Sequence, residues 1–150
     1  MLDKFNLLIF TFFNTGKLPG SGTFASLITI FIYYFVIFFF SNIFFISILL
    51  IITVYSFFFL KSVLKKFDDK DPKEIVIDEF IGQSIPLLIC GNDIILILIS
   101  FVVFRIFDIF KIFPANIFDK KINGSIGIIG DDTIAGLYTL LIIYLIKSYV

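Results

Sequence analysis

Two pairs of adjacent carboxylates lie in or beside apolar sequence, where they are well placed to hold a metal ion. Asp78 and Glu79 lie within a short apolar run, and Asp131 and Asp132 directly precede another. A charge at the centre of a bilayer costs about 2.5–3.5 kcal/mol, so adjacent acids there require a cation. Mg²⁺ prefers carboxylate and phosphate oxygens, which makes it the expected ion. The alternative is that each pair only begins a helix, where acids interact favourably with the helix dipole.

Arg105, Asp108 and Lys111 form a third charged group. Their spacing of three residues puts them on one face of a helix, because such residues are neighbours on its surface. One reading is a cationic element of a binding site. The alternative is a structural ion pair between Arg105 and Asp108, with the arginine side chain extending to the membrane interface.

A glycine-rich loop precedes the first long apolar run. Residues 15–23 read T-G-K-L-P-G-S-G-T. A turn of this kind leaves free backbone N–H groups at the positive end of a helix dipole, which suits a phosphate near Gly22 and Thr23. The alternative is an ordinary N-cap with flexible glycines. The loop contains no G-K-[ST], so it is not a Walker A motif.

Missing residue types narrow the chemistry further. The chain has no histidine and one cysteine, Cys90, which excludes histidine catalysis, an internal disulfide and a cysteine-rich metal site. Carboxylates, lysines, the single arginine, hydroxyls, backbone groups or an oxygen-held metal must therefore act. A formal net charge of zero gives no attraction to nucleic acid.

The elements that must position these residues are apolar enough to enter a membrane. Of the 150 residues 59% are hydrophobic and 16% charged, and the mean hydropathy is +1.09. The hydrophobic fraction and the mean hydropathy are higher, and the charged fraction is lower, than is typical of a soluble domain. The apolar runs cover residues 24–40, 43–60, 75–90, 94–113 and 133–146. We predict an all-α polytopic transmembrane bundle with four to five spans, a short interfacial or re-entrant segment at residues 5–14, and one domain over residues 1–150.

The lysines predict the side of the membrane that carries the polar groups. With a cytoplasmic N-terminus and five spans, the inner side receives Lys4, Lys17, Lys61, Lys65, Lys66, Lys70, Lys73, Lys111, Lys120 and Lys121. Only Lys147 falls outside, as the positive-inside rule favours. This topology places the C-terminus outside. It also brings the glycine-rich loop, both acidic pairs and the Arg105–Lys111 group to the cytoplasmic face.

Three linked motifs resemble those of the phosphatidylglycerophosphatase A family. Residues 75–82, I-V-I-D-E-F-I-G, resemble its V-I-D-E-x-x-G. Residues 104–111, F-R-I-F-D-I-F-K, resemble its F-R-x-F-D-x-x-K, and residues 127–136, G-I-I-G-D-D-T-I-A-G, its G-x-x-x-D-D-x-x-A-G. The order and spacing agree over nearly the whole chain.

The N-terminal motif is similar to the family's P-G-T-x-G-S-L only in part. Ser21 stands where the family usually has proline, and Ala25 where it has glycine. Ile112 follows Lys111 where proline is usual. These departures change local backbone geometry without removing a charged group.

The resemblance implies an enzyme of the bacterial cytoplasmic membrane that hydrolyses phosphatidylglycerophosphate to phosphatidylglycerol and phosphate with Mg²⁺. Its partner is then a phospholipid substrate in the bilayer. The implied catalytic residues are Asp78, Glu79, Arg105, Asp108, Lys111, Asp131 and Asp132. The four acids of the two pairs are expected to hold the metal. Arg105 and Lys111, with Gly22 and Thr23, are expected to bind phosphate, and either a water or an aspartate is the nucleophile.

Two other classes of protein fit parts of the pattern. A small ion-coupled transporter would use the acids as ion ligands, but it would need polar residues through the full bilayer depth. The outer halves of the predicted spans are almost purely apolar. A membrane aspartic peptidase would need two acids sharing a water, and no Arg–Lys pocket for an anion.

Overall fold

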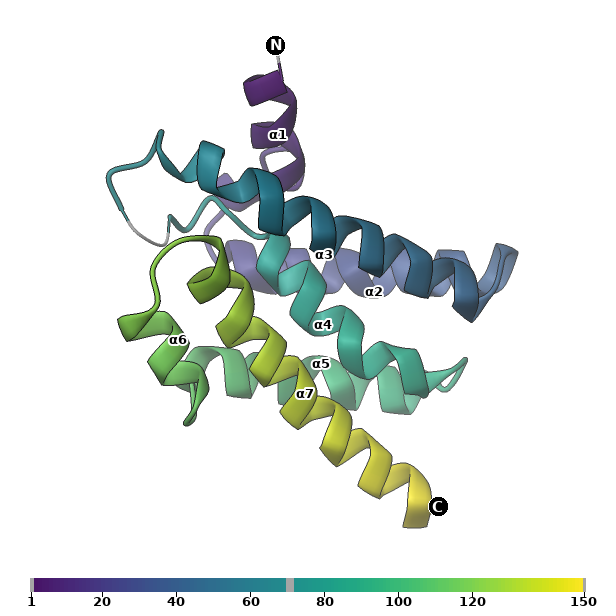
Figure 1. Cartoon of the computed structure of the whole chain (residues 1–150). Coiled ribbons are helices and arrows are strands. Elements are labelled where there is room, and N and C mark those ends of the chain that lie inside the picture. The colour runs from purple at the N-terminus through teal and green to yellow at the C-terminus, as the bar shows by residue number, and fades with distance from the viewer. Residues whose placement is uncertain (1, 70–71, 150) are drawn as a thin grey trace.

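The structure is a computed structural model that describes residues 2–69 and 72–149, and the regular secondary structure in this part of the chain is all helical. The elements are α1 (Leu2–Phe10), the 3₁₀ turn η1 (Thr15–Lys17), α2 (Ser21–Phe39), α3 (Asn42–Leu64), α4 (Ile77–Cys90), α5 (Ile94–Phe110), α6 (Ala115–Lys121) and α7 (Ser125–Tyr149). Figure 1 shows the five longest helices packed into one bundle, with α1 projecting from one side and α6 beside the start of α7. The predicted all-α fold is confirmed.

Each of the five predicted apolar runs corresponds to one helix, but the helices differ in length. Three are long and apolar enough to cross a membrane, namely α2, α3 and α7, with mean hydropathies of 2.0, 2.7 and 1.6. The other two are shorter, because α4 has 14 residues and α5 has 17. At 1.5 Å per residue they are about 21 and 25 Å long, which is less than the roughly 30 Å hydrocarbon core. The prediction of four to five spans is therefore matched only approximately.

The central helix of the bundle is α4, which packs against α2, α3, α5 and α7. Its closest neighbour is α7, and glycines make that approach possible. A Cβ atom on Gly136 would overlap the backbone carbonyl of Gly82, and one on Gly82 would lie 2.6 Å from the backbone oxygen of Asp132. Any side chain at either position would push the two helices apart.

The helices alternate in direction, and hydrogen bonds mark the end where their short turns lie. The Tyr33 hydroxyl donates to the Gly91 carbonyl at 3.1 Å, the Asn42 amide to the Leu88 carbonyl at 3.1 Å, and the Lys147 ammonium to the Ile89 carbonyl at 2.9 Å. We call this the turn end. The opposite end, which we call the polar end, holds the first turns of α2, α4 and α7 and the last turn of α5 (Figure 1).

The start of the last helix differs most from the sequence prediction. The fifth run was expected to begin at Thr133 after a polar loop, but α7 begins at Ser125, so Asp131 and Asp132 lie inside the helix. The loop also contains α6. The glycines before the acids are helical because they allow close packing: a Cβ on Gly127 would overlap the Ile122 carbonyl, and one on Gly130 the ring of Phe118. Gly127 and Gly130 therefore allow α7 to pack closely on α6 and do not form a flexible turn.

The N-terminal segment expected at the interface packs against α3 as α1. The Tyr55 hydroxyl of α3 donates to the Asn6 side chain, and the Val76 N–H donates to the Phe10 carbonyl at 2.9 Å. The segment thereby supports the residues that lead into α4. Lys70, one of the lysines used to predict topology, lies outside the described residues, and the orientation of the bundle stays a prediction.

If α7 crosses the bilayer, its two ends are on opposite sides. A compartment-sensitive reporter fused to the C-terminus should therefore give the opposite signal to one inserted between Asn123 and Gly124, just before α7. The lysine distribution further predicts that the C-terminal reporter is the external one. Equal signals from both positions, in proteins that insert normally, would contradict a transmembrane α7.

Candidate active site

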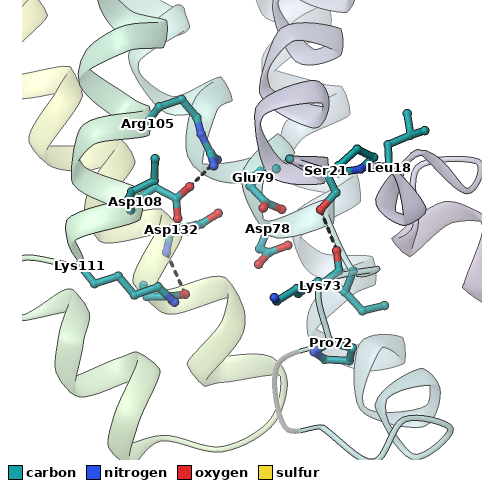
Figure 2. Close-up of a pocket in the computed structure, with 16 residues that line it drawn as sticks. Leu18, Ser21, Pro72, Lys73, Asp78, Glu79, Arg105, Asp108, Lys111 and Asp132 are labelled. Atoms are coloured by element: carbon teal, nitrogen blue, oxygen red, sulfur yellow. Dashed lines mark hydrogen bonds and ion pairs between the residues drawn. The ribbon is translucent and has the colours of Figure 1, made fainter.

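A cavity of about 470 Å³ opens at the polar end of the bundle. Four helices and the segments before α2 and α4 contribute to its wall, as Figure 2 shows. Its charged lining residues are Lys73, Asp78, Glu79, Arg105, Asp108, Lys111, Asp131 and Asp132. Every charged residue that the sequence analysis selected lies in this wall. The predicted convergence of the charged groups is therefore what the structure shows, although their chemical roles stay predictions.

Three carboxylates form the centre of the cavity. Asp78 and Glu79 are in the first turn of α4, and Asp132 reaches them from α7; one oxygen of each lies within 4.8 Å of the other two. Asp78 and Asp132 are 8% and 3% exposed. The close contact between α4 and α7, where Gly82 packs against the backbone of Asp132, sets the distances between these carboxylates.

These three residues fit a divalent cation. Oε2 of Glu79 and Oδ2 of Asp132 are buried without a hydrogen-bond partner among the described residues. Buried carboxylate oxygens of this kind are costly unless a cation or donor compensates them. The lining carries five acidic and three basic residues, so one divalent ion would balance its formal charge. An all-oxygen ligand set suits Mg²⁺ or Mn²⁺ rather than Zn²⁺.

Arg105 lines the cavity, and its side chain is directed toward Asp108 (Figure 2). Its Nη1 forms an ion pair with Oδ2 of Asp108, and its side chain is only 15% exposed. The Nε atom is buried without a hydrogen-bond partner in the described part of the chain. Gly22 makes room for this group, because a Cβ there would overlap Oε1 of Glu79 and lie 3.0 Å from Nη1 of Arg105.

Lys111 occupies the wall between α5 and α7. It ends α5 in the left-handed conformation, with φ of 43°, and its Nζ lies 2.7 Å from Oδ2 of Asp131 and 2.5 Å from Oδ1 of Asp119. The structure therefore places Asp131 beside Lys111, outside the group formed by the other three predicted metal ligands. Asp131 is better suited to hold this lysine than to join that group.

The glycine-rich loop reaches the cavity, although one predicted residue does not. Gly20, Ser21 and Gly22 line the wall, but Thr23 is not among the lining residues and its side chain is exposed. The helix begins at Ser21, three residues before the predicted apolar run, so Thr23 lies within the first turn of α2 with its side chain facing outward. The Ser21 hydroxyl instead donates to the backbone carbonyl of Lys73 at 2.9 Å (Figure 2).

Sequence reasoning missed three residues at the site. Ser21 appeared only within the glycine-rich loop and as a departure from a motif, Lys73 was counted only among the lysines of the inner side, and Asp119 was not selected. For Lys73 the available signal was its position five residues before Asp78, in the same polar approach to α4. Nothing in the sequence marked Asp119, because its pairing with Lys111 depends on how α6 packs on the glycines of α7.

A family model described as "Phosphatidylglycerophosphatase A" matches residues 8–147, a span that contains every charged residue of the cavity. The chain belongs to this family. It is 40% identical over 80 residues to the "Phosphatidylglycerophosphatase A" of Escherichia coli (strain K12), covering 53% of this chain and 46% of that protein. The "Phosphatidylglycerophosphatase A" of Haemophilus influenzae is 39% identical over 80 residues, with 53% and 49% covered.

A third relative carries a different name. The "Putative phosphatidylinositol-3-phosphatase" of Bacteroides thetaiotaomicron is 37% identical over 78 residues, with 49% of this chain and 48% of that protein covered. The matched region spans about half the length of each of these relatives. No solved structure matches this chain.

The carboxylate cluster predicts opposite effects of one substitution with and without metal. In chelator, Asp132→Asn should raise the melting temperature of the detergent-solubilised protein by about 2–4 °C. It removes like-charge repulsion of about 1 kcal/mol. With millimolar Mg²⁺ the parent should gain stability by ligand linkage and the variant should gain much less.

Asp69→Asn is the matched control, because Asp69 is exposed in the loop after α3 and does not line the cavity. It should leave the difference between chelator and Mg²⁺ unchanged. An Asp132→Asn protein that gains as much stability from Mg²⁺ as the parent would exclude Asp132 as a metal ligand.

Proposed function

We propose that this protein hydrolyses the terminal phosphomonoester of phosphatidylglycerophosphate and releases phosphatidylglycerol and phosphate. The observation that carries the proposal is one cavity that combines the Asp78–Glu79–Asp132 cluster with Arg105 and Lys111. A cluster of oxygen ligands beside two cations suits a phosphoryl group better than a peptide or an ion alone. Membership of the family and the names of the two similar bacterial proteins support the same substrate.

The walls of the cavity also suit a lipid. Apolar residues share the lining with the charged ones, including Leu18, Pro19 and Ile109. Leu18 is 47% exposed and Ile109 66%, so an apolar surface leads from the cavity to the outside of the bundle between the start of α2 and the end of α5. An acyl chain could follow this surface while the headgroup occupies the cavity.

In the proposed mechanism Arg105 and Lys111 bind nonbridging oxygens of the phosphomonoester. Asp108 orients the Arg105 guanidinium, and Asp131 with Asp119 orients the Lys111 ammonium. Asp78, Glu79 and Asp132 would hold Mg²⁺, which supplies Lewis-acid polarisation of the phosphoryl group. The protein surrounding these residues lowers the local dielectric, so charge stabilisation at the phosphoryl group is stronger there than in water.

The bond changes of hydrolysis leave two choices of nucleophile. An oxygen bonds to phosphorus while the bond from phosphorus to the glycerol oxygen breaks, and that leaving oxygen takes a proton. In one case the attacking oxygen belongs to water, whose proton passes to a cavity carboxylate. In the other it belongs to an aspartate, which forms an aspartyl-phosphate that water then hydrolyses. The lysine distribution supports a cavity that faces the cytoplasm from the bacterial inner membrane.

The relative named for a phosphatidylinositol phosphate motivates a second candidate substrate of the same chemical class. Phosphate release from phosphatidylglycerophosphate and from phosphatidylinositol 3-phosphate, measured in the same micelles, separates the two. The preferred lipid is the one with the higher kcat/KM.

Metal dependence gives the first test of the proposal. Phosphate release from phosphatidylglycerophosphate in detergent should vanish in EDTA and return with excess Mg²⁺ or Mn²⁺, since the ligands are all oxygens. Zn²⁺ should restore less activity. Full turnover in chelator would contradict the metal-assisted mechanism, whereas no turnover with any lipid phosphate and any metal would contradict the function itself.

Arg105 gives a second test, because lysine at this position keeps the charge and loses the planar fork. Arg105→Lys should lower kcat/KM by an amount equivalent to about 2–4 kcal/mol of transition-state stabilisation. The measurement is turnover normalised to folded protein in detergent. Near-parental turnover would reduce Arg105 to a structural partner of Asp108.

The double variant Arg105→Lys with Asp108→Asn distinguishes binding from structural pairing. If Arg105 and Asp108 form only a structural ion pair, the double variant should lose less activity than Arg105→Lys alone, because Asp108 is then no longer left as a charge without its partner. If Arg105 binds the phosphoryl group, the double variant should be at least as inactive as Arg105→Lys.

A further inference from the structure

Three cations line the cavity, and they differ in their partners. Arg105 is paired with Asp108, and Lys111 with Asp119 and Asp131. Lys73 lies in the segment before α4 and forms no ion pair with any residue that the structure describes. Figure 2 shows its side chain directed into the cavity on the Asp78 side, across from Lys111. An unpaired ammonium in this position favours an anionic group on the ligand.

The backbone around Lys73 is fixed to three other segments. Its carbonyl accepts the hydrogen bond from Ser21 at 2.9 Å, and the Val76 N–H binds the Phe10 carbonyl at 2.9 Å. Gly16 packs so closely on the Glu74 carbonyl that a Cβ would overlap it. Lys73 therefore starts from a held position at the cavity wall, which lowers the entropy cost of using its side chain as a ligand.

Lys73 also lies near the α2 side of the apolar surface that leads out of the cavity. Its hydrogen bond to Ser21 places it beside the start of α2, where Leu18 and Pro19 line the same cavity. Arg105 and Lys111 come from α5, across the carboxylate cluster (Figure 2). A headgroup that enters past Leu18 and Pro19, on the α2 side of the apolar surface, would meet Lys73 near its lipid end and the α5 cations at its far end.

We propose that Lys73 binds the phosphodiester of the lipid headgroup while Arg105 and Lys111 bind the terminal phosphomonoester. The inference rests on the proposed function, whose substrate carries two phosphates joined by one glycerol. Lys73 is then a specificity residue: it favours a headgroup with a second phosphate on the lipid side. A lipid whose single phosphate is the one at the α5 cations gives Lys73 no partner.

Two ligands that each carry one of the two anions provide the test. Phosphatidylglycerol with short acyl chains has only the diester, and inorganic phosphate resembles only the monoester. Calorimetry on the full chain in detergent with Mg²⁺ gives both dissociation constants. Lys73→Gln should weaken binding of phosphatidylglycerol about tenfold, the scale of one charge-assisted hydrogen bond, and change binding of inorganic phosphate less than about twofold.

Lys65→Gln is the matched control, since Lys65 is an exposed lysine at the end of α3 that does not line this cavity. It should leave both constants unchanged, and Lys73→Arg should keep most of the affinity for phosphatidylglycerol. Retained phosphate binding in Lys73→Gln shows that the variant is folded.

The proposal is overturned if the parent does not bind phosphatidylglycerol, or if Lys73→Gln binds it like the parent. It is also overturned if both ligands weaken equally, or if Lys65→Gln has the same effect, because either result indicates a general field of positive charge. These constants require no turnover. A parent that binds the diester through Lys73 but releases no phosphate would overturn the proposed function and leave this inference standing.

Discussion

The contact between α4 and α7 is the constraint on which the cavity depends. Gly82 and Gly136 let the two backbones approach so closely that no side chain fits between them. The contact has to be strong, because it holds Asp132 against Asp78 and Glu79, and these carboxylates repel one another. Packing energy from the apolar helices thus maintains an arrangement of charges that is unfavourable by itself, as is common at functional sites.

Around this cluster the cations occupy separate positions in the wall. Arg105 is held by its own helix through Asp108, whereas Lys111 is held by two other helices through Asp119 and Asp131. The guanidinium position therefore depends mainly on α5, and the ammonium position depends on how α6 packs on α7. A change in α6 would alter one cation and leave the other in place.

The sequence was sufficient for the helical class, the approximate helix positions and seven of the eight charged residues that line the cavity. Alternating spans and the lysine distribution predicted that these residues meet at one end, and they do. The start of α7 was missed because glycines in S-I-G-I-I-G read as a loop, although here they are contact points for α6. Asp119 and Lys73 were missed for a related reason. Their roles come from tertiary packing, which single-sequence periodicity does not encode.

The shortness of α4 and α5 has a consequence for the surrounding lipid. These two helices carry Asp78, Glu79, Arg105 and Asp108 of the cavity, yet they are about 21 and 25 Å long, beside α2, α3 and α7, which are long enough to cross. Because α4 is enclosed by its neighbours, the mismatch with lipid concerns α5, and it is relieved when the bilayer thins next to that helix. Such thinning would bring the lipid headgroups on the α5 side closer to the cavity at the polar end. Membrane thickness, set by acyl-chain length, would then control how easily a headgroup reaches the carboxylates.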